Sequence, residues 1–208
     1  MMMPEDEKTA IELGLDFSNT IDWRNAKLGK VPKESLTDYD ELLEWSLKHG
    51  IMRREQAKRL ASIARESGKD KSTFQRAIKL RETIYGVFSA IAHKRRPDSR
   101  NLELLNEFAS ESLAKSRIVT SGGRFRWSLY GAQEAPDMML WPIAMSAADL
   151  LTSDRLADVK ECANEEEGCG WLFIDCTKNH GRVWCSTTGC GNRARVRRFY
   201  EAHKEVSD

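Results

Sequence analysis

Four cysteines in the C-terminal quarter of the chain constrain its fold more than any other feature. Cys162 and Cys169 form one pair and Cys185 and Cys190 a second, and a glycine follows the second cysteine of each pair. Two local pairs of thiolates around one Zn²⁺ are the usual construction of a small structural zinc site. The gaps of six and four residues differ from a plain C-x2-C pair. Spacing alone therefore favours zinc and leaves ordinary buried thiols open.

The residues around the two pairs predict a β-hairpin followed by a helix. Trp171–Ile174 and Arg182–Trp184 are strand-like, and Lys178–Gly181 between them suits a tight turn. Beyond Cys190 the pattern becomes helical. A helix that begins near Gly191 would point its free N–H groups at the sulfurs and favour their thiolate form.

Three segments of this region resemble the CGNR-type zinc finger of bacterial transcription regulators. They are Cys169–Asp175, Arg182–Ser186 and Cys190–Arg193, the last reading Cys-Gly-Asn-Arg. The resemblance implies one structural Zn²⁺ per chain, with these ligands: Cys162, Cys169, Cys185 and Cys190. The insert 163–168, with three consecutive glutamates, is longer than the usual gap of the family. Cys176 stands where the family commonly has a small hydroxyl residue, and we interpret it as a buried or half-exposed spare thiol.

Composition favours a folded protein of the cytoplasm. The 208 residues are 40% hydrophobic, which is enough for a core, and no run approaches the ~20 apolar residues of a membrane span. The acidic N-terminus lacks the apolar stretch of a secretory signal. Five cysteines, four of them arranged as metal pairs, indicate a reducing compartment. We therefore expect cytoplasmic localisation and no membrane segment.

Residues 11–160 are expected to form a mostly helical α+β domain, and residues 1–10 a disordered tail. Alternating apolar residues over Leu13–Phe17 predict a half-buried strand. Helices are predicted over roughly 37–50, 53–67, 72–95 and 99–116, the first with a capping box at Thr37 and Asp40. A β-hairpin over 118–129, which the first strand could join, and a helical stretch over 141–160 follow.

The order of these elements, with Leu15–Thr20 and Asp22–Arg24, resembles the ABATE domain, the usual N-terminal companion of the CGNR finger. That domain is expected to regulate transcription, and the resemblance suggests a small-molecule effector. Candidate ligand-binding groups just past the predicted strand are Asp16, Asn19, Thr20, Trp23 and Arg24. The favoured alternative to ligand binding is an ordinary turn whose polar groups are hydrogen-bonded within the protein, with Trp23 in the core. With the finger at 161–208, the two resemblances cover nearly the whole chain.

The helix after Cys190 is the candidate DNA-binding element, because arginine forks bind phosphates and guanine edges. The expected DNA-binding residues are Arg193, Arg195, Arg197, Arg198 and Lys204. A second face of the same helix is predicted to pack on the hairpin aromatics; it carries Val196, Phe199, Tyr200 and His203. The net charge is only +1, so a solvated arginine face and a structural Arg193 remain alternatives.

The sequence thus predicts a mostly helical N-terminal α+β domain with a small antiparallel β element, followed by a four-cysteine zinc finger of hairpin and helix. We expect a transcription regulator that binds DNA, and a homodimer would enlarge its small interface. The alternative is a zinc-stabilised adaptor that binds an acidic protein, favoured by Glu165–Glu167 and the sequence pI of about 7.6. Catalysis is not expected, because a four-cysteine zinc has no open position.

Overall fold

The computed structural model describes residues 5–27, 29–131 and 133–204, and for residues 5–10, 121 and 204 it describes the backbone alone. Its α-helices are α1 (Glu5–Ser18), α2 (Tyr39–Lys48), α3 (Arg54–Glu66), α4 (Asp70–Ala92), α5 (Ser99–Lys115), α6 (Leu140–Leu151) and α7 (Asn192–Lys204). The strands are β1 (Ile21–Asp22), β2 (Lys33–Glu34), β3 (Ser116–Ser121), β4 (Arg124–Leu129), β5 (Val159–Glu161) and β6 (Leu172–Ile174). They pair as three antiparallel ribbons, β1–β2, β3–β4 and β5–β6. This architecture confirms the predicted fold class.

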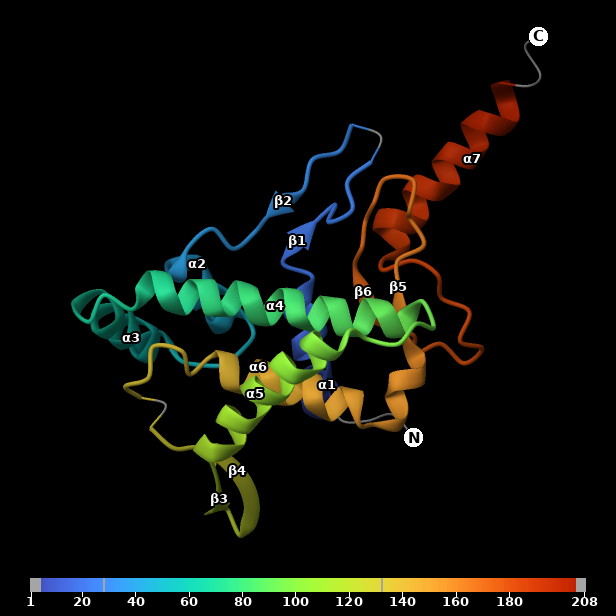
Figure 1. The fold of residues 1–208 in the computed structure, drawn as a ribbon. Helices are drawn as coiled ribbons and strands as arrows, with labels where there is room; N and C mark the ends of the chain where they lie inside the picture. Colours follow the sequence, from blue (N-terminus) through green and yellow to red (C-terminus); the bar gives the residue numbers. More distant parts are fainter. Residues whose placement is uncertain (1–4, 28, 132, 205–208) are drawn as a thin grey trace.

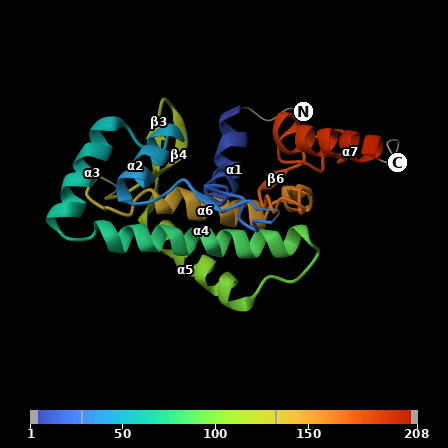
Figure 2. The same ribbon diagram turned by 90° about the horizontal axis from the view of Figure 1, so that it is seen from above.

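The long helix α4 runs across the molecule, with α2 and α3 at one end and the finger at the other (Figures 1 and 2). Its buried apolar side chains recur mostly three or four residues apart, as expected for a helix with one face in a core: Ala77, Leu80, Ile84, Val87 and Phe88. Helices α1, α5 and α6 complete this core, and α6 is apolar on nearly every side. None of the helices in the described ranges is long and apolar enough to cross a membrane.

The predicted strand at Leu13–Phe17 is wrong, because these residues belong to helix α1. Gly14 lets α1 approach α6 so closely that a Cβ there would lie 3.1 Å from the Ala147 Cβ. The Gly14 N–H also donates to Ser146 Oγ at 3.0 Å. Helix α1 is buried on several sides, so its sequence lacks a clear polar face. The backbone of residues 5–10 is helical as well, which corrects that part of the predicted tail; residues 1–4 lie outside the described range.

Two predicted boundaries also change. The cap of α2 is Asp38, whose carboxylate accepts from the Glu41 N–H at 3.0 Å, in place of the expected Thr37. Helix α6 ends at Leu151, and the rest of the predicted helical stretch is a 3₁₀ turn, η1 (Asp154–Asp158), followed by β5. The hairpin β3–β4 forms as predicted but stands alone, since no other strand among the described residues joins it.

The ribbon of the finger is built differently from the predicted hairpin. Strand β6 pairs with β5, which precedes Cys162, and the segment Arg182–Trp184 is not a strand. Instead Asp175, fully buried, accepts from the Arg182 N–H at 2.8 Å and from Lys160 Nζ at 2.7 Å. Burial alone would raise the pKa of Asp175, but these bonds outweigh it and hold the pKa below its ordinary value. One buried carboxylate thus replaces the missing strand pairing.

The finger is docked on the N-terminal domain by hydrogen bonds that join the two parts. The Asn19 side chain donates to the Leu172 carbonyl at 2.8 Å and accepts from the Leu172 N–H at 2.9 Å. It thereby satisfies the backbone of β6 from the end of α1. The Asn25 N–H, in the loop between β1 and β2, donates to the Gly168 carbonyl at 3.0 Å.

Candidate metal centre and basic helix

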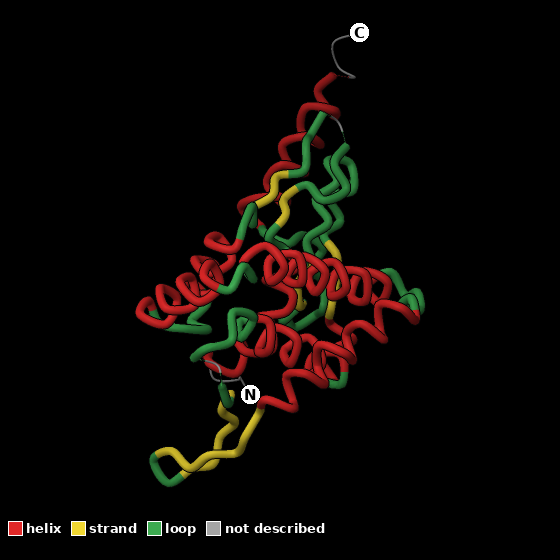
Figure 3. The backbone as a smooth tube through the Cα atoms, turned by 60° about the vertical axis from the view of Figure 1, so that its left-hand side comes forward, coloured by secondary structure: helices red, strands yellow, loops and turns green. Residues whose placement is uncertain are grey.

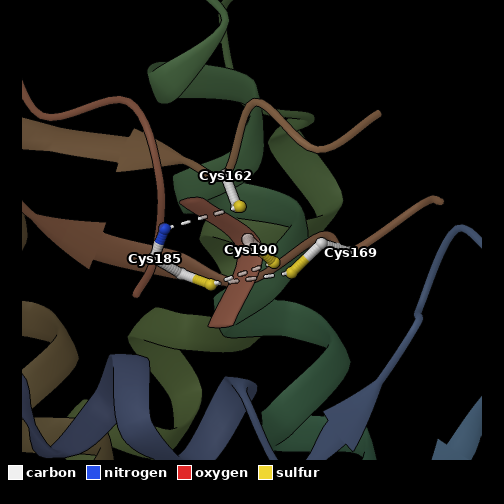
Figure 4. A group of neighbouring side chains, drawn as sticks. All are labelled: Cys162, Cys169, Cys185 and Cys190. Carbon is white, nitrogen blue, oxygen red and sulfur yellow. Dashed lines mark hydrogen bonds between the residues drawn. The ribbon is translucent and has the colours of Figure 1, made fainter. Parts of the chain in front are cut away.

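The four predicted ligand cysteines converge on one point. The Sγ atoms of Cys162, Cys169, Cys185 and Cys190 all lie within 4.8 Å of one another. Figure 4 shows the four side chains directed toward a common centre, with Cys190 arriving from the π-helical turn η2 (Thr187–Gly191) that leads into α7. All five cysteines of the chain are free thiols. Cys176 lies outside the cluster, as predicted, but it is exposed, so the predicted burial of its side chain is wrong.

The sulfur spacing fits a tetrahedral zinc ion. Zinc–sulfur bonds of about 2.3 Å place neighbouring sulfurs of a tetrahedron ~3.8 Å apart. The Cys169–Cys185 and Cys185–Cys190 Sγ distances are 3.8 and 3.6 Å. Because Cys162, Cys169 and Cys190 are buried, the site is closed on most sides. The four cysteines form a structural site for one zinc ion.

Several N–H groups point at the sulfurs and compensate their charge. The Cys185 N–H lies 3.4 Å from the Cys162 Sγ, and Asn164 Nδ2 lies 3.5 Å from the Cys190 Sγ. Arg193 Nη2 donates to the same Cys190 sulfur at 3.1 Å. Four thiolates around Zn²⁺ leave two negative charges, so donors and a cation beside the sulfurs stabilise the loaded site. Such partners orient the ligands and tune the metal, although they do not touch it.

Arg193 belongs structurally to the zinc site. Its Nε lies 3.0 Å from Glu167 Oε2, and its guanidinium carbon lies 4.7 Å from the centre of the Trp23 ring. Burial lowers the pKa of Arg193, but the Cys190 sulfur and the Glu167 charge outweigh this effect and raise it. The side chain therefore joins α7, the acidic insert and the N-terminal domain. This placement favours the structural reading of Arg193.

The acidic insert also holds Arg197. Its Nη1 forms an ion pair with Glu166, and its Nη2 lies 3.7 Å from Glu167 Oε1 and 3.4 Å from Asn164 Oδ1. Two of the five predicted DNA-binding residues, Arg193 and Arg197, therefore pair with glutamates inside the finger. Arg193 and Arg197 are one turn apart on α7, and Glu166 and Glu167 are adjacent in the insert. The sequence shows both spacings, but only the fold brings the arginines and the glutamates together.

The outer face of α7 differs from its prediction. Arg195 and Arg198 are exposed, and within the described ranges no carboxylate lies at ion-pair distance from either. The predicted packing of Val196, Phe199 and Tyr200 on the finger aromatics is wrong, because these side chains are 44%, 58% and 64% exposed. Helix α7 extends away from the body (Figure 1), and this face of the helix is exposed to solvent. The side chain of Lys204 lies outside the described part.

The five predicted effector-binding residues do not form one site. Thr20 is buried and contacts Arg81, while Arg24 pairs with Glu82 and stacks over the Tyr85 ring at 4.1 Å. These contacts join the residues that flank β1 to helix α4. Asp16 and Asn19 line a small hollow beside β6 and the finger, and Trp23 packs on Arg193. Of the five residues, Asn19 and Trp23 contact the finger directly.

Another cavity, which sequence reasoning missed, lies between α4 and the first cysteine pair. It is open to solvent and has a volume of about 460 Å³, a size typical of small-ligand sites, and the Glu161 carboxylate lines it. That carboxylate accepts from Ser89 Oγ at 2.6 Å and from the Tyr85 hydroxyl at 3.1 Å. Lys27, His93 and Arg95 also line it. Tyr85, Ser89 and His93 are spaced by four residues, and this spacing was the sequence signal for the cavity. The same spacing is equally typical of an ordinary helix face.

Comparison with known families agrees with this architecture. Residues 12–154 match the ABATE family model, described as "Putative stress-induced transcription regulator", and residues 159–203 match the CGNR zinc finger. A search of curated proteins finds no significant match. The first match alone covers more than half of the 208 residues. The chain therefore belongs to the ABATE family, with a CGNR zinc finger at its C-terminal end.

Proposed function

We propose that this protein regulates transcription by binding DNA through the exposed face of α7. One observation carries the proposal: the first turn of α7 is fixed to the zinc site, while its later turns stand clear of the protein (Figure 1). A helix rigidly mounted at one end and free on its outer face suits insertion into a major groove. Arg195 and Arg198 are its exposed cations, and they replace the five-residue set as the expected phosphate contacts.

The proposed regulator is a cytoplasmic protein without catalytic activity. Four free thiols in one metal site suit a reducing compartment. Four sulfur ligands leave no zinc position for water or substrate, so the ion serves to hold the finger together. A homodimer would add the second contact that a single short helix needs for specific binding. A small-molecule effector, if the N-terminal domain takes one, would fit the 460 Å³ cavity better than the dispersed residues around Asp16.

The second candidate function is a protein adaptor that makes no direct contact with DNA. It is favoured by the pairing of Arg193 and Arg197 with Glu166 and Glu167, which removes two cations from the outer surface. The exposed Phe199 and Tyr200 would then contact a protein. The adaptor and the DNA-binding regulator differ in how strongly their binding affinity depends on salt concentration.

The test is selection of duplex DNA from a random pool at two salt concentrations, using the zinc-loaded full chain. Each arginine that contacts phosphate contributes about one unit to the slope of log affinity against log salt. We expect Arg195→Ala with Arg198→Ala to reduce the slope by about two and weaken binding at least tenfold.

The matched control is Arg124→Ala with Arg126→Ala, which removes the same charge from the distant hairpin β3–β4. It should leave binding nearly unchanged. Equal losses in both double variants would mean that net charge, and not α7, attracts DNA. Absence of any enriched DNA with the unaltered protein would exclude the regulator proposal and favour the adaptor.

A further inference from the structure

The hairpin β3–β4 projects from the helical body at the end opposite to α7 (Figures 1 and 3). It leaves α5 directly, and at its base the Tyr130 N–H donates to the Lys115 carbonyl at 2.7 Å. Two six-residue strands without a third strand are marginally stable in water. A projecting ribbon of this length therefore gains stability from whatever covers it.

The pairing register separates the hairpin into two chemically distinct faces. Residues directly opposite each other share a face, and Ile118 pairs with Trp127 while Thr120 pairs with Phe125. These four side chains form one face, which we call the apolar face. Successive residues alternate between faces, so Arg117, Arg124 and Arg126 lie on the other, the basic face. No aspartate or glutamate occurs between Glu111 and Glu134.

The apolar face continues the core outward but is not covered. Leu129, at the base of the same face, packs against the hydrophobic core. Further out, Trp127 is 67% exposed, Ile118 64% and Phe125 79%. Large apolar side chains gathered on one face and bordered by charged residues are typical of protein–protein contacts.

We propose that β3–β4 is a dimerisation arm whose apolar face packs against the same face of a second copy of this chain. Twofold symmetry makes a surface its own partner, and two flat amphipathic ribbons can stack face to face as sheets do. Aromatic side chains bury roughly 150–250 Å² each, so the Phe125, Trp127 and Ile118 side chains of both copies bury on the order of 1,000 Å². That area is about the minimum for a specific interface.

Charge also favours a second copy on the apolar face. In the stacked arrangement the arginines of both copies point outward, so like charges do not meet at the interface. A nucleic acid would be drawn to the opposite, basic face and would leave Phe125 and Trp127 uncovered. The arm lies far from α7 along the molecule, so each finger remains accessible in the dimer (Figure 3).

This inference locates the interface of the homodimer included in the proposed function. Sedimentation equilibrium of the zinc-loaded full chain over the micromolar range tests it. We expect a species of twice the 23.7 kDa chain mass, in exchange with the monomer. Phe125→Thr with Trp127→Thr should raise the dimer dissociation constant by about 100-fold or more, since buried aromatic residues dominate small interfaces. Threonine keeps a high strand propensity, so the ribbon is retained.

Thr120→Arg provides a second variant that leaves both aromatic residues in place. It buries a cation within the apolar interface and should also dissociate the dimer. The matched control is Arg124→Thr with Arg126→Thr, on the basic face of the same strand, which should leave dimerisation unchanged. A dimer insensitive to all apolar-face variants would overturn the arm while preserving the homodimer. A single species at the chain mass would overturn both. Weaker DNA binding in the basic-face control, with no dimer, would assign the hairpin to nucleic acid.

Discussion

Gly168 shows how a single residue joins the zinc loop to the N-terminal domain. Its φ of +73° is a conformation that side chains rarely adopt, and a Cβ there would lie 1.9 Å from the Asn25 carbonyl oxygen. We predict that Gly168→Ala lowers the free energy of unfolding by ~3 kcal/mol, because both the φ penalty and a backbone clash apply. Urea denaturation of the zinc-loaded protein measures it. Gly50→Ala is the matched control, with φ +68° and nothing within 4 Å, and should cost only about 1 kcal/mol. Equal losses would show that the finger and the domain do not meet at Gly168.

At the scale of elements, the insert between the first two cysteines acts on helix α7. Glu166 pairs with Arg197, so one cation that could contact phosphate is neutralised within the protein. Arg197 would keep its contacts with Glu167 and Asn164 but lose its main carboxylate partner. We predict that Glu166→Gln therefore strengthens DNA binding several-fold at low salt, measured by fluorescence anisotropy with a mixed-sequence duplex. Glu165→Gln makes the same charge change at the neighbouring exposed position and should have a smaller effect. If both variants bind equally tightly, general charge explains the gain and the ion pair does not.

The elements also show where sequence reasoning succeeds. The helices from Tyr39 to Lys115 are close to their predictions, because each has one apolar face and a clear stop such as Gly50 or Gly68. Helix α1 was missed because it is packed on several sides and its apolar residues happen to alternate. Strand β5 was missed because three residues carry too little pattern. The cysteine cluster was predicted from its local spacing together with the resemblance to the CGNR finger, whereas the Glu166–Arg197 pair depends on how the insert folds over α7.

For the whole molecule, zinc holds together only the C-terminal part of the fold. The main apolar core lies mostly in α1, α4, α5 and α6, and Val159, Leu172 and Ile174 of β5 and β6 extend it, whereas the cysteine cluster is a separate small group of buried residues. We therefore predict that removal of zinc by a chelator unfolds the finger and leaves the N-terminal helices folded. Hydrogen exchange should rise from β5 through α7 and remain slow in α4.

Two cysteine variants sharpen this prediction about the whole molecule. Cys190→Ser removes a ligand and should reproduce the effect of the chelator without adding one. Cys176→Ser changes an exposed thiol outside the cluster and should keep one zinc per chain by metal analysis. Since Asn19 and Asn25 bind the finger backbone, a moderate rise in exchange at the end of α1 should accompany finger unfolding. Unfolding of α4 together with the finger would instead mean that the two parts form one cooperative unit, whose stability depends on the metal throughout.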